Sequence, residues 1–211
     1  MNPTNPYIGA YPFLKGRRRI WREIVRFVQK DVPTARTVVE LGAGYCDFIN
    51  QFPAPRKIAF DLNPEMAAFA APEVELRTGE ATTLSGIKAE SIDLVFASNF
   101  LEHLRQEQLA ALLPRIRSVL APGGRLILIQ PNYRLCADRY FEDPTHQTIF
   151  DDASIVELLT MHAFHVIRLE PGVLPFSMKS RLPQWGCLTR LYLRSPIKPM
   201  AAQMYVVAER A

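Results

Sequence analysis

The sequence predicts an α/β fold in which seven strands form a mostly parallel sheet with helices on both faces. Short apolar runs rich in Val, Ile, Leu and Phe alternate along the chain with longer segments of helical periodicity. The runs at 37–41 and 74–78 are followed directly by Gly, which favours turns. Strands that alternate with helices need crossover connections, which make neighbouring strands parallel and place helices on both faces. The chain has no internal repeat.

Seven runs of five or six residues are expected to be strands, because they are too short and too apolar for amphipathic helices. The weakest is 74–78, in which apolar and polar residues alternate. The predicted strands are residues 37–41, 57–61, 74–78, 92–97, 125–130, 164–169 and 203–208.

The first predicted helix covers residues 17–30, after a Pro-, Asn- and Gly-rich loop at 2–11, and Pro33 ends it. Its outer face is basic, with Arg18, Arg22 and Arg26 opposite an apolar stripe. Further helices are expected after Asn63-Pro64, over 106–120 and from Asp151 to His162.

Residues 171–200 interrupt this alternation with a stretch that contains no acidic residue. Loops of that length are uncommon unless they have a function. Trp185, Leu188 and Leu191 share a helical face with Tyr192, opposite Arg190 and Arg194, so we expect a short helix that covers the core. The chain is then a single domain with three parts: 1–35, a loop and basic helix; 36–170, the core; and 171–211, a basic insertion and the strand that completes the sheet.

The composition is that of one folded domain: 211 residues, 48% hydrophobic and 22% charged. No run approaches the roughly 20 apolar residues of a membrane span, and the first ten residues lack the apolar core of a signal peptide. Cys46, Cys136 and Cys187 are far apart and form no CxxC pair. These features favour a reducing compartment and a cytoplasmic protein, without a disulfide framework or a zinc ribbon.

Charge is divided unevenly along the chain. Residues 1–30 hold seven Lys/Arg and one acid (+6), and residues 171–211 hold six and one (+5). Residues 31–170 hold twelve basic and nineteen acidic residues (−7). The basic ends either complement the acidic body or meet an anionic partner, such as an anionic membrane surface or a lipid-linked glycan at the inner membrane.

A glycine loop follows the first strand, and glycines at 42 and 44 let backbone approach a ligand closely. Asp47 occupies the third glycine position of a GxGxxG dinucleotide fingerprint, and its carboxylate would repel a pyrophosphate. The phosphate-loop motif is also absent, because no GK[ST] follows. Asp61, nineteen residues after Gly42, ends the second strand, where a carboxylate accepts hydrogen bonds from both hydroxyls of a ribose. The pattern favours a nucleoside ligand without phosphates.

Residues 36–131 resemble class I S-adenosylmethionine (SAM)-dependent methyltransferases, which have a Rossmann-like fold. The motifs are VVELGAG at 38–44, FDLN at 60–63, GEA at 79–81, IDLVFASNFLEHL at 92–104 and LAPGGRLIL at 120–128. Cys46 and Glu80 depart from the family, which often has Gly and Asp there. The resemblance implies SAM as cofactor, S-adenosylhomocysteine (SAH) as product, and a set of cofactor-binding residues. These are Glu40, Gly42, Ala43, Gly44, Asp61, Leu62, Glu80, Ala81 and Asn99, with Glu40 alternatively holding the loop.

The sequence disfavours several classes of methyl acceptor, because the motifs of the enzymes that methylate them are missing. Ser98-Asn99-Phe100-Leu101 lacks the D/N-P-P-Y/F run of enzymes that methylate amino groups of nucleobases or glutamine. Cys136 follows Leu135 rather than the Pro that typically precedes the nucleophile of cytosine C5 methylation. The acidic residues of 138–143 match no metal-ligand spacing, so no metal is expected.

The loop 132–150 mixes polar and aromatic residues, which suits a sugar or polyol. Its run 141–146, with 179–183 and 191–194, resembles segments of bacterial methyltransferases found near cell-surface polysaccharide genes. We therefore expect a small-molecule or glycan O-methyltransferase. A nucleic-acid methyltransferase that uses the basic ends, and a SAM-binding regulatory protein without catalysis, are the alternatives.

A hydroxyl acceptor needs a general base, whereas a carboxylate acceptor needs none. His146 is the predicted base, because its loop follows the fifth strand on the ligand edge, with Asp143 orienting its ring. His103, after the fourth strand, is the competing candidate, although it could also be a packed residue at a helix start.

Overall fold

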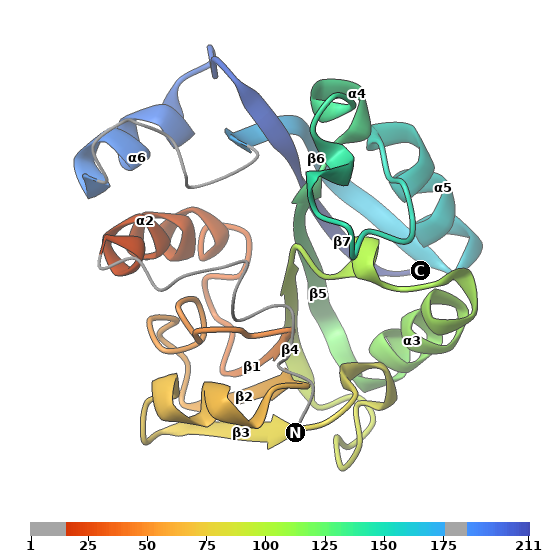
Figure 1. The fold of residues 1–211 in the computed structure, drawn as a ribbon. Coiled ribbons are helices and arrows are strands. Elements are labelled where there is room, and N and C mark those ends of the chain that lie inside the picture. Colours follow the sequence, from red (N-terminus) through yellow and green to blue (C-terminus); the bar gives the residue numbers. More distant parts are fainter. Residues whose placement is uncertain (1–15, 176–184) are drawn as a thin grey trace, which may run out of the picture.

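A seven-stranded sheet forms the centre of the molecule, with helices on both of its faces (Figure 1). The structure is a computed structural model and describes residues 16–175 and 185–211. The loop predicted over 2–11 and the run 179–183 lie outside the described residues. The strands are β1 (Thr37–Leu41), β2 (Arg56–Asp61), β3 (Val74–Thr78), β4 (Ile92–Ser98), β5 (Leu120–Pro131), β6 (Phe164–Pro175) and β7 (Ala201–Arg210).

The strand order is β3-β2-β1-β4-β5-β7-β6. The pairs β1–β2, β1–β4, β2–β3 and β4–β5 are parallel, and β7 lies antiparallel between β5 and β6. This confirms the predicted seven-stranded, mostly parallel, Rossmann-like sheet. The direction of strand order reverses between β1 and β4, so ligands are expected in the crevice at the carboxyl ends of these two strands.

Helices α2 (Arg17–Val28) and α6 (Gly186–Arg194) cover one face of the sheet, and α3 (Gln106–Val119) and α5 (Asp152–Met161) the other (Figure 1). Because side chains alternate along a strand, β1 contributes to both cores. Val38 belongs to the core cluster of α2, whereas Val39 belongs to that of α3 and α5. The shorter helices are η1 (Pro64–Phe69), η2 (Ala81–Thr83), η3 (Leu101–His103), α4 (Tyr133–Cys136) and η4 (Tyr140–Glu142).

Strand β5 begins five residues earlier than the sequence suggested, at Leu120 instead of Arg125. Ile92 pairs with Leu120 and Leu94 with Arg125, so the predicted turn at 122–124 is a bulge within the strand. A Cβ on Gly124 would lie 2.6 Å from the Ile92 carbonyl oxygen, which explains the glycine there.

Helix α6 forms as predicted, but its orientation differs from the prediction. Trp185, Leu188 and Leu191 are 57%, 41% and 68% exposed, although their face was expected to cover the core. Leu193 is buried instead, and Arg190 turns inward to Glu23 on α2. The amphipathic pattern predicted the wrong buried face, because the buried Glu23 carboxylate on α2 binds Arg190 and so turns the arginine side of α6 inward. No helix in the described ranges has the length and apolar character needed to cross a membrane.

Candidate active site

The glycine loop after β1 bends through three left-handed residues, Gly42 (φ 66°), Gly44 (φ 50°) and Cys46 (φ 55°). A Cβ on Gly42 would lie 2.6 Å from Cδ2 of Phe100, whereas a Cβ on Gly44 would meet no atom of the described residues within 4 Å. Gly42 therefore admits the Phe100 ring, and Gly44 leaves open space above the backbone. The glycine that the family often has in place of Cys46 is explained by this positive φ.

Helix α2 braces the same loop from outside. The Arg17 guanidinium donates to Asp47 at 2.7 Å and lies over the Tyr45 ring. Asp47 is thus a structural partner of Arg17. Burial raises the pKa of the Asp47 carboxyl, and the bond from Arg17 opposes this rise.

Asp61 anchors the loop to the end of β2. One carboxylate oxygen accepts from the Gly44 N–H at 2.7 Å, and the other from the Asn63 N–H at 2.8 Å. Each oxygen keeps a second lone pair for a ribose hydroxyl. Asn63, and not Asp61, caps η1 by accepting from the Glu65 N–H.

Glu40 is buried and accepts a hydrogen bond from the Ile49 N–H at 3.1 Å. This is the loop-holding role that the sequence left open beside cofactor contact. Burial raises the pKa of Glu40 well above its usual value, with Asp47 and Asp61 adding to the rise.

The other predicted cofactor residues are distributed along the same edge of the sheet. Ala43 and Ala81 are buried, whereas Leu62 is 66% exposed next to Asp61. Glu80 and Asn99 are exposed, and Asn99 accepts from the Gln203 side chain. Open space at Gly44, free lone pairs on Asp61 and exposed residues beside them are compatible with a bound nucleoside.

Two segments far apart in the sequence meet beside this loop. The backbone N–H groups of Gln147 and Thr148 donate to the carbonyl of Glu102, at 2.8 and 3.1 Å. The Gln147 side chain donates to the carbonyl of His103, and the Thr148 hydroxyl to that of Leu104. These bonds join the turn after β4 to the loop after β5.

The joined segments bring Glu102, His103 and His146 together. The imidazole centroids are 4.9 Å apart, and the His146 ring also packs on Tyr140 at 4.6 Å. Glu102 is 0% exposed. Within the described residues, neither of its carboxylate oxygens has a hydrogen-bond partner of good geometry, and neither does His146 Nδ1. The backbone N–H groups of Glu102 and Phe100 lie close enough to the Glu102 carboxyl to lower its pKa, against the larger effect of burial. The two histidines, which the sequence treated as rivals, are neighbours.

Burial dominates the protonation of this cluster. It raises the pKa of Glu102 to about 8, with Asp143 adding to the rise. Burial also lowers the pKa of His103 and the pKa of His146. The neighbouring His146 lowers the pKa of His103 further, and the negative charge of Asp143 opposes the decrease at both histidines. The cluster therefore presents neutral imidazoles at neutral pH.

Asp143 acts on this pair through Thr145. Its Oδ1 accepts from the Thr145 N–H and from the Thr145 hydroxyl, and that hydroxyl lies 2.9 Å from Nδ1 of His103. Through Thr145, Asp143 is connected to His103; the expected orientation of the His146 ring by Asp143 stays a prediction.

The sequence interpretation did not assign a functional role to Glu102. The only signal was a carboxylate within the apolar turn after a buried strand, a place where acids are seldom buried without a partner. Tyr140 was also not singled out, and its hydroxyl fixes the loop by donating to the Thr148 carbonyl.

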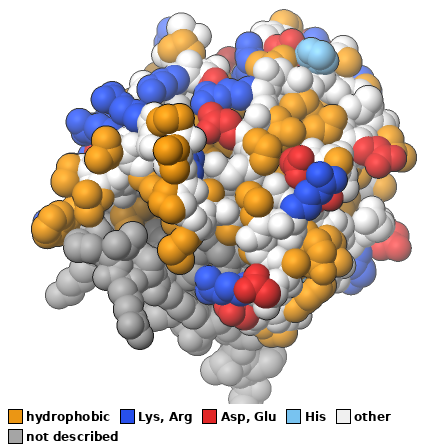
Figure 2. All heavy atoms as spheres, turned by 90° about the horizontal axis from the view of Figure 1, so that it is seen from above, with side chains coloured by type: hydrophobic (Ala, Val, Ile, Leu, Met, Phe, Trp, Pro, Cys, Tyr) orange, Lys and Arg blue, Asp and Glu red, His pale blue; other side chains and the backbone are white. Residues whose placement is uncertain are grey.

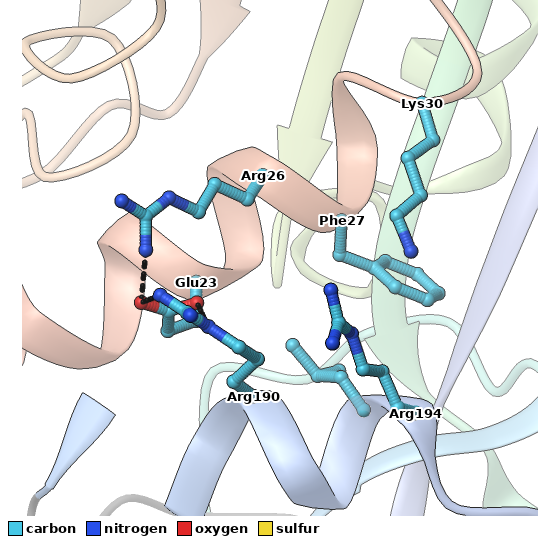
Figure 3. A pocket seen from close by; sticks show the side chains of 7 residues that line it. Glu23, Arg26, Phe27, Lys30, Arg190 and Arg194 are labelled. Carbon is cyan, nitrogen blue, oxygen red and sulfur yellow. Dashed lines mark hydrogen bonds and ion pairs between the residues drawn. The ribbon is translucent and has the colours of Figure 1, made fainter. Parts of the chain in front are cut away.

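A concave region lies between α2 and α6, away from the glycine loop (Figure 3). It is a cavity of about 260 Å³ lined by Glu23, Arg26, Phe27, Lys30, Arg190, Leu193 and Arg194. Arg26 and Arg190 both bind the Glu23 carboxylate. Lys30 and Arg194 flank Phe27 and form no ion pair within the described residues.

Known proteins resemble this chain in sequence and in fold. Residues 39–128 match the methyltransferase domain family. A trans-aconitate 2-methyltransferase of Variovorax paradoxus is 28% identical over 123 residues, which cover 55% of this chain and 44% of that protein. The matched stretch thus spans less than half of that relative.

Solved structures show the same fold. A SAM-dependent methyltransferase of Archaeoglobus fulgidus superimposes with a TM-score of 0.69 at 17% identity, covering 92% of this chain and 94% of that one. One from Mesorhizobium loti gives 0.63 at 14% identity, with 89% and 96% covered. At such identities the likeness concerns the fold alone. The match to the methyltransferase domain family is limited to residues 39–128, and the fold is that of solved SAM-dependent methyltransferases.

Proposed function

We propose that this chain is a SAM-dependent methyltransferase that methylates a hydroxyl oxygen of a small-molecule or glycan acceptor. The observation that carries the proposal is the cluster of Glu102, His103 and His146 next to the glycine loop, where Phe100 joins the two sites by packing on Gly42. A neutral imidazole nitrogen without a partner is suited to accept the proton of a hydroxyl.

The residues divide the work between binding and proton transfer. Asp61 and the Gly44 backbone hold the nucleoside, together with the other residues assigned from the resemblance. SAM supplies an activated methyl group for in-line displacement, which depends mainly on positioning. His146 accepts the acceptor proton, and Asp143 with Thr145 orients His103 beside it. The mixed polar and aromatic loop 132–150 contacts the acceptor.

The relative named for trans-aconitate suggests another acceptor class, a carboxylate. A carboxylate is already ionised and needs no base, so the partnerless imidazole would have no part in its methylation. The histidine cluster therefore favours a hydroxyl. A nucleic-acid acceptor and a SAM-binding protein without catalysis remain outcomes of the test.

The test is methyl transfer from labelled SAM to three acceptor pools: sugars and bacterial glycan extract, carboxylic acids including trans-aconitate, and RNA. We expect product only with the first pool. His146→Ala should lower turnover by the ~10²–10⁴ typical of a lost base while SAH affinity, measured by calorimetry, stays unchanged. His165→Ala, an exposed histidine on β6, is the control.

Full turnover in His146→Ala would remove the base assignment. Product with carboxylic acids alone would remove the hydroxyl acceptor, and product with RNA alone would favour the nucleic-acid alternative. SAH binding without transfer to any pool would favour a non-catalytic SAM-binding protein.

We further propose that α6 and its surroundings contact an anionic membrane surface. Exposed apolar side chains there lie next to Lys and Arg side chains, seen at the left of Figure 2. Arg18 and Arg22 on α2 are exposed, and Arg194 on α6 has no ion pair within the described chain. The exposed apolar residues are Trp185, Leu188, Leu191, Ile197 and Met200.

Co-sedimentation with phosphatidylglycerol vesicles should show binding that fades as salt rises, because each basic residue near the surface contributes about 1 kcal/mol. The double variant Leu188→Ser/Leu191→Ser should lose this binding. Ile149→Ser/Met161→Ser, at exposed apolar positions elsewhere, should not. Equal recovery with neutral phosphatidylcholine vesicles would contradict the proposal.

A further inference from the structure

We propose that Glu102, His103 and His146 bind one divalent transition-metal ion of the zinc class. Each side chain offers a ligand atom, and these atoms all lie within 4.8 Å of one another. Two imidazole nitrogens and one carboxylate oxygen are the protein ligands of many catalytic zinc sites, which keep a fourth position open. The same set suits other first-row divalent ions that prefer nitrogen and oxygen ligands.

The strongest support is the carboxyl group of Glu102. Its side chain is fully buried, yet among the described residues neither oxygen has a hydrogen-bond partner of good geometry; only the backbone N–H groups of Glu102 and Phe100 approach it. Five buried side-chain polar atoms lack a partner in the described part of the chain, and three of them, both Glu102 oxygens and His146 Nδ1, belong to this cluster. Burying such groups without a partner is unfavourable, and a cation between them would satisfy all three.

The surroundings hold the ligands in place. Metal-bound histidines usually have a hydrogen bond at the second ring nitrogen, and Nδ1 of His103 lies 2.9 Å from the Thr145 hydroxyl. That hydroxyl donates to Asp143, which adds negative charge near the site. The backbone carbonyl of Glu102 accepts two hydrogen bonds from the loop that carries His146. The turn after β4 and the loop after β5 are therefore fixed relative to each other.

The distances require only a small adjustment. Zinc bonds of roughly 2.0–2.2 Å place tetrahedral ligand atoms about 3.3 Å apart. The present limit of 4.8 Å is compatible with that value after modest side-chain rotation. His103 and His146 are half-buried as residues, whereas the Glu102 oxygens and His146 Nδ1 are buried, so a bound ion would lie beneath the surface.

The role of the ion rests on the proposed methyl transfer to a hydroxyl, and it replaces the assignment of His146 as the base. An acceptor hydroxyl would take the fourth position, and its proton would leave to water because metal-bound oxygens ionise more readily. The oxygen then forms a bond to the methyl carbon while the carbon–sulfur bond breaks and its electron pair goes to sulfur. In this case His146 is a ligand, and the metal replaces it in promoting loss of the proton.

The experiment measures metal binding without cofactor or acceptor. The full chain is treated with a chelator, exchanged into metal-free buffer and titrated with Co²⁺ by visible absorption and with Zn²⁺ by calorimetry. We expect one equivalent to bind, with the d–d bands of a low-coordinate Co²⁺ site. Glu102→Gln and His146→Ala should each weaken binding at least about 100-fold, because the first removes the anionic charge of a ligand and the second removes a ligand nitrogen; outer-shell changes alone cost roughly 10–100-fold. His165→Ala, at an exposed surface histidine, should bind as the wild type does.

Thermal unfolding checks that the variants fold. Without metal, Glu102→Gln should unfold at or above the wild-type temperature. Zn²⁺ should raise the unfolding temperature of the wild type and of His165→Ala, but not of Glu102→Gln or His146→Ala. The absence of stoichiometric binding in the wild type would overturn the proposal. So would equal affinities of Glu102→Gln and His165→Ala, which would indicate adventitious surface sites.

SAH calorimetry on the metal-free chain separates this inference from the proposed function. If the wild-type chain binds no metal but still binds SAH and transfers methyl groups, the metal site is contradicted and the proposed function is not. Stoichiometric metal binding without SAH binding or methyl transfer contradicts the proposed function and leaves the site in place.

Discussion

At the scale of single residues, the glycine loop depends on backbone conformations that side chains disfavour. Gly42 and Gly44 both have positive φ, but only Gly42 has a neighbour, the Phe100 ring, where a Cβ would be. The two glycines therefore serve different purposes. Gly42 permits packing, and Gly44 keeps space free for the expected nucleoside.

This difference gives a matched pair of variants. Gly42→Ala and Gly44→Ala share the cost of a left-handed Ala, roughly 1–2 kcal/mol. Gly42→Ala should lose more stability than Gly44→Ala in urea unfolding, since it also displaces Phe100. Gly44→Ala should keep more stability but lose SAH affinity, because its methyl group enters the open space. Equal unfolding free energies would show that the Phe100 contact contributes nothing.

At the scale of elements, the sequence was sufficient to predict the strands, but it predicted only part of the contacts between segments that lie far apart in the chain. Periodicity located all seven strands, because burial on both faces selects continuous apolar runs such as 37–41. It could not reveal that Glu102 and His146 meet, since that contact depends on backbone hydrogen bonds between two irregular segments. It also failed for the orientation of α6, which is decided by the buried Glu23 on another helix.

Helix α5 illustrates an element whose start is set by one carboxylate. Asp151 accepts from the Ala153 and Ser154 N–H groups, and Arg134 donates to it at 2.9 Å. The Ser154 N–H, with help from Arg134, lowers the pKa of Asp151 to about 2.

We expect Asp151→Ala to destabilise the fold by about 1 kcal/mol at pH 7, and Asp151→Asn by less, because Asn retains the cap. The folded pKa lies below the unfolded value of about 3.9, so this stabilisation is complete above pH 4 and disappears as the pH falls toward 2. Urea unfolding between pH 2 and 7 measures it. A wild-type advantage over Asp151→Ala that is unchanged at pH 2 would contradict the assignment.

At the scale of the whole molecule, Asp31 links parts that are far apart in the sequence. It follows α2 and accepts from Arg168 on β6 and from the Tyr205 hydroxyl on β7, both at 2.7 Å. The Arg168 guanidinium also lies over the rings of Phe27 and Tyr205. The first described helix is thereby tied to the two C-terminal strands.

Tyr205→Phe should reduce the free energy of unfolding by about 1.5–3 kcal/mol, the range for a hydrogen bond to a charged group. Tyr192→Phe removes a hydroxyl that bonds the exposed Pro199 carbonyl and should cost little. Urea unfolding of both variants compares them directly. Similar losses in the two would show that the link through Asp31 does not stabilise the fold.

The position of β7 has a consequence for synthesis of the chain. β5 and β6 do not pair with each other and are joined only through β7, which spans Ala201–Arg210. While the chain emerges from the ribosome, β1 to β4 can associate, but the outer edge of β5 and the whole of β6 must wait for the last strand. During that interval an apolar edge is exposed to other nascent chains. A chain interrupted before residue 201 would keep that edge open for good, which makes such fragments natural clients of chaperones and proteases.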